Sequence, residues 1–233
     1  MRYLWKQLPK PLRNYFHKAL HRLNSSMFLL KICKFRHKIT ARKISSLESA
    51  PLLRIGESRK FSGWVSTNYQ VFTRYFLDAT KYYGDQVCSC IYADNVIEHL
   101  DRKDGLLLIK RAYEALKSGG VLRITTPDLR SIVDKYLEGS SEDVQQFALD
   151  LQEHSLDIQN HSDLLRITFT AFGHHKGIIY DFETLKKLLE SIGFVEIHKY
   201  VPGFSNNSNL NNLESRVGTT DMWSQMAVEA TKP

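Results

Sequence analysis

Long apolar stretches and paired cysteines are scarce in this sequence. No run of 18 or more apolar residues occurs, so the sequence predicts no membrane span. Phe28-Leu29-Leu30 is too short and lies too far along the chain for a secretory signal, which favours a cytoplasmic protein. The three cysteines, Cys33, Cys88 and Cys90, cannot all pair within one chain. We therefore expect reduced, buried cysteines and no disulfide scaffold.

Acidic side chains are absent from residues 1–47, which contain twelve Lys or Arg, whereas the rest of the chain has 20 basic and 25 acidic side chains. The net charge of +7 therefore comes from an N-terminal arm, and the body carries −5. Apolar residues recur at helical spacing in the arm between Tyr3 and Leu23. Such a helix suits the anionic inner face of a membrane, an acidic partner protein or a nucleic acid. Packing on the body with a solvated basic face explains the same pattern.

Residues 91–129 are the most informative stretch. They predict a buried strand, a loop, an amphipathic helix, a stop at Gly119-Gly120 with positive φ, and a second buried strand. A strand, a helix and a strand in so short a span indicate a parallel crossover in a doubly wound α/β sheet. Ligands bind beyond the carboxyl ends of such strands. The polar residues expected at those ends are Asp94, Asn95, Glu98, His99 and Asp128.

The chain has room for one well-packed α/β domain, residues 48–233, besides the arm of residues 1–47. Residues 136–177 mix apolar and polar side chains after the second buried strand, and we expect a helical lid over the cleft there. Asn and Ser are frequent in residues 205–212. These side chains suit the hydroxyls of a sugar, although a solvated loop has the same composition.

Four segments taken in order, IGESRKFSGWVSTN, LDAT, IYADNVIEHL and ALKSGGVLRITTPDL, resemble the class I S-adenosylmethionine-dependent methyltransferases. They are most similar to a compact bacterial group associated with surface-glycan biosynthesis, as is HHKGIIYDFETLKKLLESIGF. The resemblance covers residues 51–233. It implies a Rossmann-like fold: a mostly parallel seven-stranded sheet, helices on both faces and an antiparallel strand near the C-terminus. It also implies S-adenosylmethionine as cofactor and a hydroxyl of a sugar or glycan precursor as acceptor.

The same resemblance assigns the cofactor-binding residues. It places Gly56, Glu57 and Ser58 at the methionine part, Asn68 at the ribose, Asp78 and Ala79 at the adenine, and Asp94 and Asn95 at the amino group or methyl. Two positions depart from the family pattern, since Ser58 replaces a glycine and Asn68 replaces an acid. Losing the charged partner of the ribose costs roughly 1–2 kcal/mol. A catalytically weakened relative that serves as a binding or assembly subunit is therefore an alternative, and a nucleic-acid methyltransferase is a third.

A hydroxyl acceptor requires a general base. The candidates are His99, His174, His175 and Asp181; we expect His99 and His175 to be catalytic, since His175 lies nearest the family's histidine. Asp181 precedes a predicted helix and is interpreted as its N-cap, and the same role is an alternative for Asp94. No His, Asp and Glu cluster has the sequence spacing of metal ligands, so no metal is expected.

Overall fold

The structure, a computed structural model, describes residues 52–56, 64–66, 86–139, 142–153, 158–171, 173–214, 218–219 and 221–233. The basic arm lies outside the described residues. So do five of the predicted cofactor-binding residues, which are Glu57, Ser58, Asn68, Asp78 and Ala79. No helix in the described part of the chain is long and apolar enough to cross a membrane.

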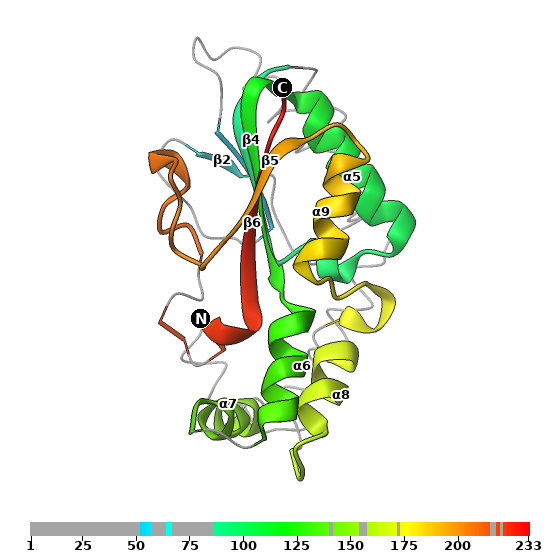
Figure 1. The fold of residues 1–233 in the computed structure, drawn as a ribbon, viewed down its shortest axis with the longest axis vertical. Coiled ribbons are helices and arrows are strands. Elements are labelled where there is room, and N and C mark those ends of the chain that lie inside the picture. Colours follow the sequence, from blue (N-terminus) through cyan, green and yellow to red (C-terminus); the bar gives the residue numbers. More distant parts are fainter. Residues whose placement is uncertain are drawn as a thin grey trace, which may run out of the picture.

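A six-stranded mixed sheet forms the centre of the described chain (Figure 1). In spatial order its strands are β2 (Trp64–Ser66), β1 (Leu52–Gly56), β3 (Cys88–Asp94), β4 (Leu116–Pro127), β6 (Gln225–Thr231) and β5 (Val195–Tyr200). The first four strands are parallel, and β6 runs antiparallel to both of its neighbours. The α/β class and the antiparallel strand near the C-terminus are thus confirmed. The seventh expected strand is not among the described residues.

The crossover predicted for residues 91–129 is present, with one difference at its turn. Helix α5 (Arg102–Ala115) begins at Asp101, whose carboxylate accepts a hydrogen bond from the Asp104 backbone N–H at 2.8 Å. The helix ends at Ala115, and β4 starts at Leu116, which pairs with Cys88. Gly119 has the expected positive φ of +73°, but it lies inside β4 and not at the helix C-terminus. Burial of Leu116 draws the chain into the sheet before it reaches the glycines.

The two faces of the sheet are covered differently. Helices α5 and α9 (Phe182–Glu190) pack their apolar side chains on one face, where they form the main hydrophobic core (Figure 1). On the opposite face, Leu210 and Leu213 of the loop after β5 contact Cys90 and Tyr92. The sequence led us to expect helices on both faces, and in the described residues they cover only one. Cys88 and Cys90 are buried thiols, as expected, and burial raises the pKa of Cys88 to about 12.

Three further helices lie beyond the carboxyl end of β4 (Figure 1). They are α6 (Leu129–Glu138), α7 (Glu142–Glu153) and α8 (Asp163–Thr170). Asp128 begins α6: its carboxylate accepts hydrogen bonds from the Arg130 backbone N–H and the Ser131 hydroxyl, and it pairs with Lys199. Asp128 therefore has a structural role. Helices α7 and α8 fall within residues 136–177, and the assignment of that stretch as a lid insertion stays a prediction.

Candidate functional site

The order of the strands changes direction between β1 and β3. From β1 the chain continues to β2 on one side, and then returns to β3 on the other side of β1. Ligands of open α/β sheets bind at such a switch point, beyond the carboxyl ends of the two strands. The parallel register places Gly56, the last residue of β1, opposite Asp94, the last residue of β3. The structure thus brings together two of the residues that the sequence assigned to the cofactor.

Asp94 is a buried carboxylate at this switch point, with 1% of its surface exposed. The short helix that follows, η2 (Ile97–His99), has Val96 as its N-cap residue. The helix-cap alternative for Asp94 stays a prediction. Its carboxylate accepts a hydrogen bond from Tyr92, and burial keeps the pKa of that phenol well above its ordinary value. Tyr92 is therefore a neutral donor that orients Asp94 at neutral pH.

Asn95 turns the chain out of the sheet directly after Asp94. Its φ of +48° lies in the left-handed region, which Asn tolerates better than most residues. Its backbone N–H donates to the Thr125 carbonyl at 3.0 Å, and its side-chain Nδ2 donates to Gln225 Oε1 at 3.0 Å. These contacts fasten the end of β3 to β4 and to the start of β6. Among its described contacts, Asn95 acts as a positioning residue beside Asp94.

Three potential ligand or acid–base groups meet just past this turn. Glu98 and His99 lie on η2, and His174 lies on a second short helix, η3 (His174–Lys176). The His99 and His174 rings have centroids 4.9 Å apart, and His99 Nε2 is 3.9 Å from Glu98 Oε1. Glu98 is buried, and its Oε2 accepts a hydrogen bond from the Thr126 hydroxyl at 3.3 Å. His175, the histidine that the sequence favoured, is exposed on η3, and its neighbour His174 approaches His99 instead.

Two glycines allow η3 to lie directly against η2. A Cβ on Gly177 would be 1.7 Å from the Glu98 carbonyl oxygen, a position that no side chain can occupy. A Cβ on Gly173 would meet His99 Nδ1 at 3.5 Å, and Gly173 has a φ of +94°. The close approach of the two backbones places His174 beside Glu98 and His99. Sequence reasoning named all three residues singly, but it could not detect that they form one cluster.

Asp181, the remaining base candidate, begins α9. Its carboxylate accepts a hydrogen bond from the Thr184 backbone N–H at 2.7 Å. Hydrogen bonds from the Thr184 hydroxyl and then from its backbone N–H lower the pKa of Asp181. The N-cap interpretation is confirmed.

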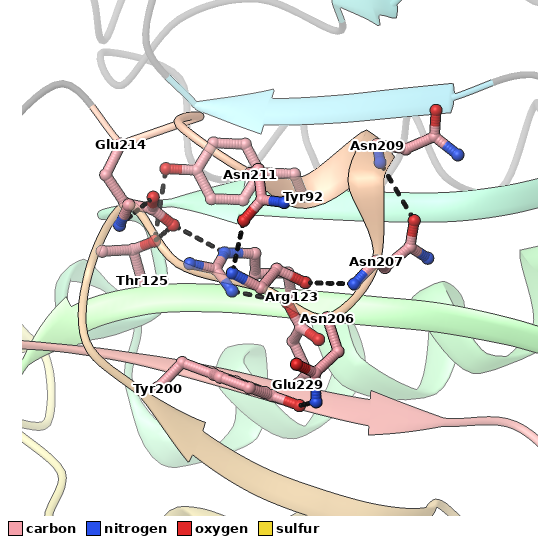
Figure 2. Close-up of polar contacts among 12 residues, drawn as sticks. Tyr92, Arg123, Thr125, Tyr200, Asn206, Asn207, Asn209, Asn211, Glu214 and Glu229 are labelled. Atoms are coloured by element: carbon pink, nitrogen blue, oxygen red, sulfur yellow. Dashed lines mark hydrogen bonds and ion pairs between the residues drawn. The ribbon is translucent and has the colours of Figure 1, made fainter.

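Sequence reasoning missed a buried charge network on the loop-covered face (Figure 2). Arg123 has no exposed surface; its Nε donates to Glu214 Oε1 at 2.6 Å, and its Nη1 donates to Glu229 Oε1 at 2.5 Å. The Thr125 hydroxyl lies 3.2 Å from the Tyr92 hydroxyl and 3.4 Å from Glu214 Oε1. Through Tyr92 the network reaches Asp94. The sequence did contain a signal for this network, which is Arg123 in the middle of an otherwise apolar predicted strand.

The Asn-rich loop lies over this network (Figure 2). Asn207 Oδ1 accepts a hydrogen bond from the Asn209 backbone N–H at 3.0 Å, and Asn211 Oδ1 accepts one from the Ser205 backbone N–H at 2.6 Å. Asn206 Nδ2 donates to the Tyr200 hydroxyl at 3.3 Å. These amides therefore shape the loop and hold it to the sheet. These contacts lend no support to a role in binding a sugar.

Comparison with known proteins gives remote structural similarity alone. No protein-family model matches the chain, and no curated protein sequence matches it. An S-adenosylmethionine-dependent methyltransferase from Archaeoglobus fulgidus has a TM-score of 0.42 at 14% identity, over 89% of this chain and 100% of that one. One from Thermotoga maritima, described as a possible histamine N-methyltransferase, has a TM-score of 0.39 at 13% identity, over 99% of each chain.

A third similar structure is phosphoethanolamine N-methyltransferase 2 from Haemonchus contortus, in complex with phosphomonomethylethanolamine and S-adenosylhomocysteine. It has a TM-score of 0.40 at 12% identity, over 85% of this chain, which spans about half (52%) of that enzyme. Scores this low leave the function to be inferred from the residues of this chain.

Proposed function

We propose that this chain is an S-adenosylmethionine-dependent methyltransferase that methylates a hydroxyl of a sugar or glycan precursor. The observation that carries the proposal is the pairing of Gly56 with a buried Asp94 at the switch point of the sheet. The sequence resemblance assigns these two positions to the cofactor. Bound S-adenosylmethionine supplies an electrophilic methyl group, and the protein mainly has to align donor and acceptor.

The described residues fit the amino-acid part of such a cofactor. Gly56 has no side chain, so a ligand can approach the backbone at the end of β1. Asp94 offers a buried carboxylate that the Tyr92 hydroxyl orients, and such a group suits an ammonium. Directly after Asp94 the chain turns at Asn95, which has a φ of +48°. The residues assigned to the ribose and the adenine lie outside the described residues.

On the acceptor side, His99 is the residue that could take a proton from a hydroxyl. Its side chain is 16% exposed, and the buried Glu98 carboxylate 3.9 Å away would stabilise the imidazolium that forms. The sugar acceptor itself is supported by the sequence resemblance alone, because the amides of residues 205–212 bond within their own loop or to the sheet.

Calorimetric titration with S-adenosylmethionine tests the cofactor assignment. We expect Asp94→Asn to weaken binding about 10–100-fold, because a charge-assisted hydrogen bond contributes about 1.5–3 kcal/mol. Asp134→Asn is the matched control, since Asp134 pairs with Arg130 on the surface of α6. Absence of binding by the unaltered protein at millimolar cofactor would reject the enzyme and leave the binding or assembly subunit.

The acceptor is tested by the release of S-adenosylhomocysteine in the presence of sugar nucleotides and, separately, RNA. Turnover with a sugar nucleotide is the expected result, and His99→Ala should slow it by about 10²–10⁴-fold while cofactor affinity stays unchanged. Turnover with RNA alone would contradict the sugar acceptor and favour a nucleic-acid methyltransferase.

A further inference from the structure

Glu98, His99 and His174 have the donor set and the proximity of a metal site. One ligand atom from each residue lies within 4.8 Å of the other two. Donors bound to one ion at about 2.0–2.2 Å lie about 3.3 Å from one another. Small rotations of the side chains would therefore bring the three atoms around a single ion. Two imidazoles and a carboxylate suit Zn²⁺ and neighbouring transition metals better than Mg²⁺.

The surrounding contacts orient these donors. His174 Nδ1 is 2.7 Å from the Thr168 carbonyl oxygen, and a carbonyl can only accept a hydrogen bond. His174 Nδ1 therefore carries the hydrogen, and Nε2 carries the lone pair that a metal needs. A metal-binding histidine usually donates such a hydrogen bond from the ring nitrogen that does not bind the metal. The Thr126 hydroxyl similarly holds Glu98 through Oε2.

The cluster also lies where an ion could act. Glu98 is buried beside His99 and His174. Gly177 and Gly173 fix η3 against η2, so the two halves of the cluster are held together by the fold. The three residues belong to the segment that follows Asp94 and Asn95 and to η3, which contacts it. An ion held there would lie close to the carboxyl edge of the sheet.

We propose that Glu98, His99 and His174 bind one divalent transition-metal ion, of which Zn²⁺ is the best match. Three protein ligands leave at least one position on the ion open. The role of that position rests on the proposed function: the acceptor hydroxyl would coordinate there, and the ion would lower its pKa as a Lewis acid, so that its proton passes to solvent water as the oxygen takes the methyl group. His99 would then serve as a ligand, and water would replace it as the proton acceptor.

The test is metal titration of the full-length protein after chelation and dialysis. Zn²⁺ affinity is measured by competition with a chromophoric chelator, and Co²⁺ is added separately as a spectroscopic probe. We expect one ion per chain, a Co²⁺ spectrum of nitrogen and oxygen ligands, and affinity more than about tenfold weaker in His174→Ala and in Glu98→Gln. His175→Ala, on the same short helix but exposed, should bind the ion like the unaltered protein.

Each outcome bears on the inference. Absence of stoichiometric binding, or unchanged affinity in both ligand variants, would overturn it. A sulfur-to-cobalt charge-transfer band would do the same, because it would place the ion on cysteine. Glu98→Gln keeps the size of the side chain, so it remains informative if His174→Ala fails to fold. Cofactor binding without metal binding would overturn this inference and leave the proposed function standing. Metal binding without cofactor binding would support this inference and overturn the proposed function.

Discussion

Replacing Gly177 with alanine tests the contact that assembles the Glu98, His99 and His174 cluster. The new methyl carbon would lie 1.7 Å from the Glu98 carbonyl oxygen and 2.5 Å from its carbonyl carbon, whereas real Cβ atoms essentially never come within 3.0 Å of such a neighbour. Both atoms belong to the backbone, so no side-chain rotation can relieve the clash. The backbone of η3 would have to move away from η2 by roughly 1 Å or more, because packed interiors have little spare volume.

The expected cost follows from that displacement. Overpacking of this kind typically costs about 1–3 kcal/mol of the free energy of unfolding, and a chain of this size loses about 2–4 °C in Tm per kcal/mol. Urea and thermal denaturation measure both quantities. Since the displacement carries His174 away from Glu98, the affinity for Zn²⁺ should fall by about 10–100-fold, the range seen when the support of metal ligands is disturbed. S-adenosylmethionine affinity, which depends on Gly56 and Asp94, should change little.

Gly139→Ala is the matched control. Gly139 has a φ of +87°, and a Cβ there would meet nothing within 4 Å. Gly139 also has a ψ of −161°, in a region that is essentially restricted to glycine, so alanine at this position should cost about 1–3 kcal/mol through backbone strain alone and leave metal affinity unchanged. A Gly177→Ala protein with unaltered stability and unaltered metal affinity would refute the close packing of η2 against η3.

Three further predictions concern the cap, the network and the arm. Asp181→Ala should lose about 1 kcal/mol of stability at pH 7. Because the pKa of Asp181 is lowered in the fold, its contribution is complete above the ordinary aspartate pKa and is lost as the pH falls through the lowered pKa, so the difference between the urea curves of the two proteins should shrink as the solution is acidified. Arg123→Met should cost about 3–5 kcal/mol in urea unfolding, since it leaves Glu214 and Glu229 buried without their cation; a loss below 1 kcal/mol would contradict this reading. Deleting residues 1–47 should abolish co-sedimentation with anionic vesicles, to which each well-placed cation contributes about 1 kcal/mol, and equal binding of the intact chain to neutral vesicles would argue against an electrostatic arm.

The parts of the fold that the sequence predicted depend on neighbouring residues. The crossover between Ile91 and Leu129 follows from apolar periodicity and turn glycines, and the Asp181 cap follows from its place before an amphipathic helix. Such patterns act over one or two turns of chain, so they can be read without knowing the tertiary structure. The end of α5 was misplaced because pairing of Leu116 with Cys88, a tertiary contact, overrides the local glycine signal.

The site could be predicted only in part, because its geometry depends on distant contacts. Asp94 and Gly56 were predicted from their positions at strand ends and from the family resemblance, and their pairing follows once the strand order is known. The choice between His174 and His175 could not be made, since adjacent residues on a short helix point in different directions. It is set by Gly177, whose backbone contact with Glu98 fixes which histidine faces His99.

The buried network connects the loop after β5 to the carboxylate at the switch point. Arg123 and Thr125 lie beside Tyr92 and Asp94 in the register of β3 and β4, so alternate residues of both strands face the loop that contains Glu214. Tyr92 bonds both Thr125 and Asp94, and it therefore links the orientation of the switch-point carboxylate to the docking of that loop. The Glu98, His99 and His174 cluster depends instead on the packing of η2 against η3. A change that loosens the loop should therefore weaken cofactor binding first, and a change at Gly177 should affect metal binding first.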